Sequence, residues 1–175
     1  MLGNVPPEGP VRRFVMRDKL LGIGDDHWIE DEHGHAAYKV DGKVARVRDT
    51  WILEDAQGNQ VAQIRERKLT VRDTVKIEWA GGEATVRKAL IGFRDRFTVD
   101  LSDGSELKVK GDILDREYKI ESHGDKVAEI SKKWFRIRDA YGIEVEPVIN
   151  PALVIAIAVA VDEMADDKDD DEEPG

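Results

Sequence analysis

The feature that most constrains the fold of this 175-residue chain is an internal repeat. An arginine-aspartate pair, with glutamate in one copy, recurs every 22 to 24 residues, at Arg48, Arg72, Arg94, Arg116 and Arg138. Each copy opens a unit made of an alternating apolar and polar run, a glycine-bearing turn and a second alternating run. Self-similarity at this period is typical of a supersecondary unit that stacks on its neighbours. We therefore expect a series of β-hairpins that bury one another's apolar faces.

The runs between the turns alternate with a period of two, as in Phe97, Thr98, Val99, Asp100 and Leu101. This period indicates half-buried antiparallel strands. We expect about twelve of them. Their predicted ranges are 12–16, 27–31, 36–40, 46–54, 60–66, 74–79, 84–89, 96–101, 106–110, 117–121, 126–131 and 142–146.

The segment from Pro151 to Val161 is apolar at every position, and its own periodicity does not distinguish a helix from a strand. Asn150 followed by Pro151 is a favourable helix start, whereas the β-branched residues favour a strand. The segment is shorter than the roughly 20 residues that a membrane-spanning helix needs. An element that is apolar on all sides must be buried on all sides, and a large closed barrel needs a filled lumen. We therefore expect a central helix at about 151–163 inside a closed antiparallel barrel, with core residues Leu153, Val154, Ile155, Ile157, Val159 and Val161.

The ends of the chain differ in composition from its middle. Residues 1–10 are rich in proline and glycine and are expected to be a disordered leader. Residues 166–175 are mostly acidic and are expected to be a solvated, disordered tail. The barrel domain is therefore predicted to span residues 11–165.

Composition limits the classes of partner. The net charge of −10 repels phosphate backbones, so nucleic acid is not an expected partner. The chain has no cysteine, which excludes disulfides and thiol catalysis, and its N-terminus has no signal-peptide pattern. We expect a cytoplasmic protein, with peripheral membrane association as an option.

Three short motifs and the C-terminal segment resemble the LURP-one-related proteins of the tubby C-terminal-like and phospholipid scramblase superfamily. The motifs are Gly111-Asp-Ile-Leu-Asp-Arg-Glu-Tyr118, Ala128-Glu-Ile-Ser-Lys132 and Asp139-Ala-Tyr-Gly-Ile-Glu-Val145, and an apolar segment ending at Asp162 follows them. The resemblance covers about residues 11–165. It implies a twelve-stranded antiparallel barrel around a hydrophobic helix. Tubby domains bind phosphoinositide headgroups through basic residues on the barrel surface, which suggests a similar role for basic residues here.

Two basic stretches are candidates for such a headgroup site. Their residues are Arg87, Lys88, Arg94 and Arg96 in the first stretch, and Lys132, Lys133 and Arg136 in the second. Each cation near an anionic membrane surface contributes about 1 kcal/mol of attraction. Outward-facing lysine and arginine also simply keep strands soluble, and this alternative stays open.

Two other patterns are interpreted as structural. The pair His33 and His35 lies in a turn with no second spaced pair, so we expect a solvated loop and no metal site. The repeated arginine-aspartate pairs are expected at connections between hairpins, where both side chains make local contacts.

We expect a non-enzymatic binding or scaffold domain, with an anionic phospholipid or a protein as its partner and no cofactor. The sequence contains no nucleophile elbow, phosphate-binding glycine loop or spaced metal ligands. The alternative is a carrier that holds a small apolar ligand inside the barrel. A helix in the lumen would leave no room for such a ligand, so the position of the 151–161 segment separates the two hypotheses.

Overall fold

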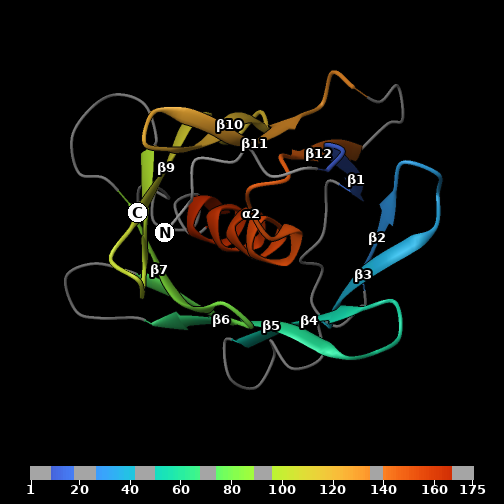
Figure 1. Ribbon diagram of the computed structural model, residues 1–175, viewed down its shortest axis with the longest axis horizontal. Coiled ribbons are helices and arrows are strands. Elements are labelled where there is room, and N and C mark those ends of the chain that lie inside the picture. Colours follow the sequence, from blue (N-terminus) through green and yellow to red (C-terminus); the bar gives the residue numbers. More distant parts are fainter. Residues whose placement is uncertain are drawn as a thin grey trace, which may run out of the picture.

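The computed structural model describes residues 9–17, 27–41, 50–67, 74–88, 96–134 and 140–166. Within these ranges twelve antiparallel strands form a closed barrel, and a single helix follows them (Figure 1). The strands are β1 (Arg12–Arg17), β2 (His27–Asp31), β3 (Ala36–Asp41), β4 (Thr50–Asp55), β5 (Gln60–Arg67), β6 (Thr74–Trp79), β7 (Gly82–Lys88), β8 (Arg96–Leu101), β9 (Glu106–Asp112), β10 (Glu117–Ser122), β11 (Asp125–Ser131) and β12 (Ala140–Val145). The helix is α2 (Pro151–Asp166).

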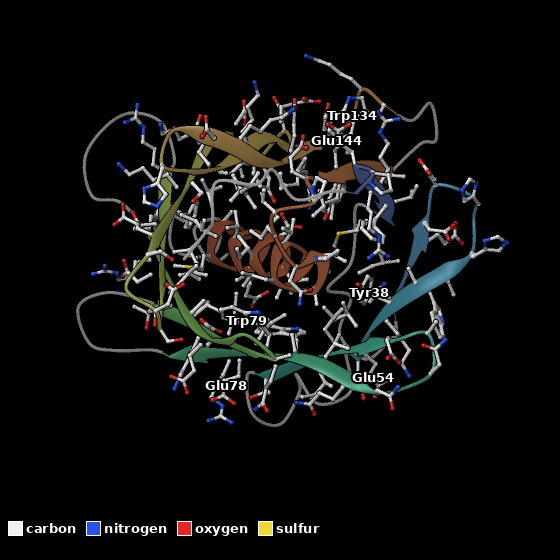
Figure 2. All side chains as sticks on the ribbon, viewed as in Figure 1. Tyr38, Glu54, Glu78, Trp79, Trp134 and Glu144 are labelled. Atoms are coloured by element: carbon white, nitrogen blue, oxygen red, sulfur yellow. The ribbon has the colours of Figure 1, made fainter. Side chains whose placement is uncertain are left out.

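Each strand pairs with its neighbours in the chain, and β1 closes the barrel by pairing with β12. The closing register runs from Arg12 opposite Val145 to Arg17 opposite Ala140. The predicted alternation is present in β8, where Phe97 and Val99 face inward and are buried. Charged side chains such as Glu54 and Glu78 point away from the helix (Figure 2). The sheet has no open edge, so every strand is protected from pairing with another molecule.

Helix α2 lies inside the ring of strands (Figure 1). The Asn150 side chain caps it, because Oδ1 accepts a hydrogen bond from the Ala152 N–H at 2.9 Å, and Pro151 is the first helical residue. Every residue from Ala152 to Asp162 is buried, including all six predicted core residues. The segment is therefore a central helix, and it extends to Asp166, three residues beyond the predicted end. The helix occupies the lumen that a carrier of apolar ligands would have to keep open, which disfavours that alternative.

Tight turns join the strands of the hairpins at one end of the barrel. In the β2–β3 turn, Asp31 Oδ1 accepts hydrogen bonds from the N–H groups of His33 and His35, both at 2.9 Å. Asp55 makes the same pair of bonds in the β4–β5 turn, and the fourth residue of each turn is a glycine with positive φ. His33 and His35 thus lie in a turn, as predicted. Among the described residues there is no cluster of three or more groups that could hold a metal ion.

The arginines of the repeated pairs precede β4, β6, β8, β10 and β12 in the sequence. Arg116 lies in the turn between β9 and β10, which confirms the predicted location at a connection between hairpins. The prediction expected local contacts, whereas Arg116 forms an ion pair with the distant Asp162 of α2. Arg48, Arg72, Arg94 and Arg138 lie outside the described residues, as do residues 1–8 of the predicted leader and 167–175 of the predicted tail. No helix in the described ranges is long and apolar enough to cross a membrane.

Candidate functional site

The residues of the first predicted basic stretch do not share one environment. Arg87 lies on the outer face of β7 and forms an ion pair with Asp100 of β8. Lys88, the next residue, lies on the inner side, where its ammonium is buried 5.7 Å from the centre of the Phe97 ring. Lys88 is therefore turned away from the surface that a headgroup could reach. Arg94 lies outside the described residues.

Arg96 belongs to a row of cations that crosses three strands. It is the first residue of β8, and its register partner on β9 is Lys110. Lys110 is in turn opposite Lys119 of β10. All three side chains are exposed, and Arg96 and Lys119 make no ion pair within the described ranges. Neighbouring strands are about 4.8 Å apart, so the row places three positive charges within about 10 Å.

Acids lie beside this row. Glu129 of β11 is the register partner of Lys119, and its carboxylate pairs with Lys126 at 2.8 Å. The carboxylate of Glu121 accepts a hydrogen bond from Lys110 at 2.7 Å. This bond, with the nearby charges of Lys110, Lys119 and Lys108, lowers the pKa of Glu121. Lys108 lies 3.9 Å from Glu106. The row of Arg96, Lys110 and Lys119 itself contains no acid, in contrast to Lys39 and Glu54, which face each other on β3 and β4 and form an ion pair at 2.9 Å.

The second predicted stretch meets the same face at the start of β10. The carboxylate of Glu117 accepts hydrogen bonds from the Ser131 hydroxyl at 2.7 Å and the Lys132 N–H at 3.0 Å. These bonds hold the segment after β11 against β10, two residues from Lys119. Lys132 and Lys133 are exposed, and Arg136 lies outside the described residues.

An exposed tryptophan ends this segment. Trp134 is 37% exposed and projects from the outside of the barrel (Figure 2). An indole that is apolar on its ring and polar at its N–H suits the interface between a membrane and water. We call the outward side chains gathered here the cationic surface, and its members are Arg96, Lys108, Lys110, Lys119, Lys132, Lys133 and Trp134.

Sequence reasoning missed four members of the cationic surface: Lys108, Lys110, Lys119 and Trp134. The three lysines alternate with apolar residues in runs that were correctly predicted as strands. The missing information was the register between strands, which decides which outward residues become neighbours. Arg96, Lys132 and Lys133 were predicted, and the structure brings them close to the same stretch of β10.

Comparisons with known proteins agree with this architecture. The family model for LURP-one-related proteins matches residues 12–162. A crystal structure of a protein from Arabidopsis thaliana aligns with a TM-score of 0.68 and 21% sequence identity, covering 93% of this chain and 99% of the other. At this identity the likeness concerns the fold. A comparison with curated proteins gave no match.

Proposed function

Because the chain belongs to the LURP-one-related family, we propose that it is a non-enzymatic binding domain that recognises anionic phospholipid headgroups through the cationic surface. On this proposal the protein associates peripherally with a membrane from the cytoplasm and needs no cofactor. The second predicted partner class, a protein, is considered below with a different part of the barrel.

The observation that carries the proposal is the row formed by Arg96, Lys110 and Lys119. Like charges directly opposite one another in a sheet destabilise it. A phosphate group placed over the row would remove this repulsion and accept hydrogen bonds from the three side chains. The row thus has an energetic cost in the free protein that an anionic ligand offsets.

The attraction to an anionic membrane has to come from the cationic surface, because the net charge of the protein is negative. The net charge of −10 repels an anionic membrane at long range, but exposed charges are screened beyond about 8 Å at physiological ionic strength. Within that distance each cation contributes about 1 kcal/mol. Trp134 lies beside Lys133 and can add interfacial contact once the cations have docked.

Vesicle co-sedimentation tests the proposal with the full chain. Vesicles of phosphatidylcholine containing a phosphoinositide should bind the protein at low salt, and binding should weaken steeply as salt is added. The variant Arg96→Gln/Lys119→Gln should lose about fivefold in affinity for each charge removed. The matched control is Arg65→Gln/Lys76→Gln, which removes two cations that face each other in register on β5 and β6.

The control should bind the vesicles as the wild-type protein does, after correction for its change in net charge. Equal loss in both variants would show that only overall charge matters, and it would contradict a local site. No association with phosphoinositide vesicles even at low salt would overturn the proposal.

A further inference from the structure

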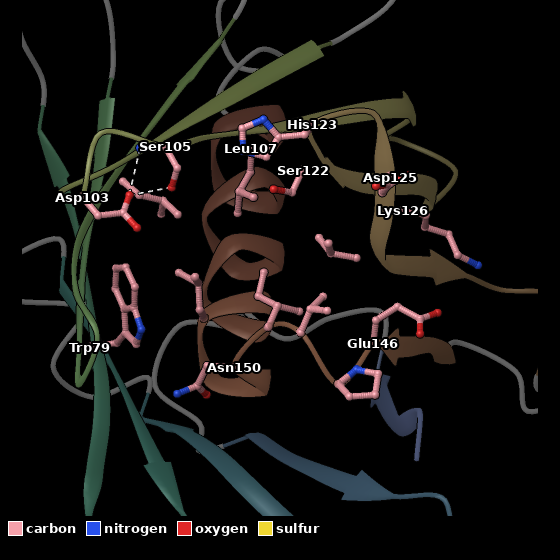
Figure 3. Close-up of a pocket in the computed structure, with 16 residues that line it drawn as sticks. Trp79, Asp103, Ser105, Leu107, Ser122, His123, Asp125, Lys126, Glu146 and Asn150 are labelled. Atoms are coloured by element: carbon pink, nitrogen blue, oxygen red, sulfur yellow. Dashed lines mark hydrogen bonds between the residues drawn. The ribbon is translucent and has the colours of Figure 1, made fainter. Parts of the chain in front are cut away.

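An open cavity of about 970 Å³ lies at the end of the barrel where helix α2 begins (Figure 3). Its walls come from the turns of three hairpins and from the segment 146–150 that leads into the helix. Binding sites for small ligands usually have volumes of about 300–1,000 Å³. The cavity lies at the tight-turn end of the barrel, whereas the cationic surface lies on the outer wall, so the two sites are separate.

The floor of this cavity is apolar. Leu107 of β9, Val127 of β11 and Leu153 of the first helical turn line it and are almost completely buried. The indole of Trp79 forms part of one wall (Figure 3). Gly81 leaves room for the indole, because a Cβ atom at this position would lie 2.5 Å from Trp79 Nε1.

The rim is acidic. Asp103 lies on the same wall as Trp79, and Asp125 and Glu146 lie on the opposite wall (Figure 3). The carboxylates of Asp125 and Glu146 make no ion pair within the described ranges. Lys126 also lines the cavity, but its ammonium pairs with Glu129 at 2.8 Å and Glu144 at 3.6 Å. The other basic residue in the lining is His123.

The start of helix α2 also contributes charge to the cavity. A helix N-terminus is equivalent to about half a positive charge. Here the Asn150 side chain caps the Ala152 N–H, and the Asn150 carbonyl accepts from the Val154 N–H at 3.2 Å. Three full negative charges on the rim outweigh this partly satisfied half charge, so the cavity favours a cation.

We propose that this cavity binds a peptide segment of a partner protein that carries an arginine next to an apolar side chain. Trp79 provides a face on which a planar guanidinium stacks, and carboxylates on both walls pair with its charge. The apolar neighbour of the arginine occupies the floor formed by Leu107, Val127 and Leu153. The net charge of −10, which opposes membrane binding, favours the approach of a basic peptide.

The test uses the full chain and a set of synthetic hexapeptides with blocked ends, in which one arginine is flanked by leucines. Binding is measured by calorimetry and located by amide chemical shifts. The arginine peptide should bind and shift the resonances of the 122–127 and 146–150 segments. Replacement of arginine by citrulline, which has the same shape without the charge, should weaken binding about tenfold or more.

Substitutions of residues that line the cavity should also weaken peptide binding. Glu146→Gln and Asp125→Asn should each weaken binding of the arginine peptide about two- to fivefold, as expected for exposed ion pairs. Trp79→Leu should reduce the preference for arginine over lysine, because it removes the stacking face. The control Arg96→Gln/Lys119→Gln should bind the peptide unchanged, and Glu146→Gln should bind vesicles unchanged.

These controls distinguish a failure of the peptide proposal from a failure of the lipid proposal. Equal binding of the arginine and citrulline peptides would overturn the proposed charge recognition. Amide shifts confined to other parts of the barrel would also overturn it. The same holds if a fatty acid displaces the peptide and Glu146→Gln has no effect on peptide binding.

Discussion

Arg116 reaches into the barrel and contacts Asp162 of the central helix, with Nη2 and Oδ2 separated by 3.3 Å. The Tyr141 hydroxyl donates a hydrogen bond to the same Oδ2 at 3.2 Å. The guanidinium of Arg116 also lies over the Tyr141 ring, 5.2 Å from its centre. A residue of the sequence repeat thus fixes the helix to the wall at the end opposite the cavity.

This contact predicts the effect of Asp162→Asn. The two charged side chains are only 17% and 7% exposed, so loss of the carboxylate leaves a guanidinium that is largely withdrawn from water. We expect the free energy of unfolding to fall by about 2 kcal/mol, as measured by urea denaturation. Arg13→Gln is the control, because Arg13 is 54% exposed where it pairs with Glu144, and its loss should cost less than about 1 kcal/mol. Equal effects of the two variants would contradict an anchoring role for Asp162.

The same cluster predicts how stability responds to alkali. Burial, and then the charge of Asp162, raises the pKa of Tyr118 and of Tyr141 well above the usual value of about 10. A folded-state pKa that lies above the unfolded value stabilises the fold below the unfolded pKa. This stabilisation is lost as the pH rises above about 10.

Phenolate absorbance measures this effect. Burial raises the pKa of Tyr38 less strongly, so Tyr38 should ionise first. Tyr118 and Tyr141 should ionise only together with the loss of circular dichroism. Ionisation of all three tyrosines near pH 10 in a protein that remains folded would contradict the buried cluster.

A third prediction concerns the core of the barrel. Ile155 lies in the middle of the buried face of α2 and is completely shielded from solvent. Ile155→Asp places an unpaired carboxylate there, which costs several kcal/mol of the roughly 5–15 kcal/mol that stabilise a domain. We expect an unfolded or insoluble protein, whereas Ile155→Val should fold and lose about 1 kcal/mol. A soluble Ile155→Asp variant with an unchanged melting temperature would contradict the central helix.

The architecture could be predicted from the sequence because its determinants are local. The hairpin period, the alternation in runs such as 96–101 and the cap formed by Asn150 and Pro151 each depend on residues that are close in the chain. Closure followed from packing, since an entirely apolar segment needs a lumen to fill.

The two binding surfaces depend on contacts between distant segments. Lys110 and Lys119 become neighbours of Arg96 only through the registers of β8, β9 and β10. The acidic rim forms where the β8–β9 and β10–β11 hairpins meet the segment before α2, and no spacing in the sequence brings Asp103 and Glu146 to opposite walls. The inward orientation of Lys88 was likewise not predicted. Successive residues of a strand face opposite sides of the sheet, so Lys88 lies inward beside Phe97 although its neighbour Arg87 lies outward.

The last prediction compares two positions at which this barrel requires glycine for different physical reasons. Gly111 in β9 has φ +138°, and a Cβ atom there would lie 2.4 Å from the Glu117 carbonyl oxygen and 2.7 Å from the Tyr118 Cα. Both atoms belong to the backbone of β10 and cannot rotate away. We therefore expect Gly111→Ala to lower the free energy of unfolding by about 3 kcal/mol or more, through combined strain and overpacking.

Gly58→Ala is the matched variant in the β4–β5 turn. Gly58 has φ +84°, but no atom lies within 4 Å of a Cβ placed there, so only the backbone conformation is strained. This substitution should cost about 1–2 kcal/mol. Urea denaturation of both variants measures the difference, and Gly58→Asn should recover part of the loss because asparagine tolerates positive φ. A Gly111→Ala variant as stable as Gly58→Ala would show that β9 and β10 do not approach each other as closely at this position.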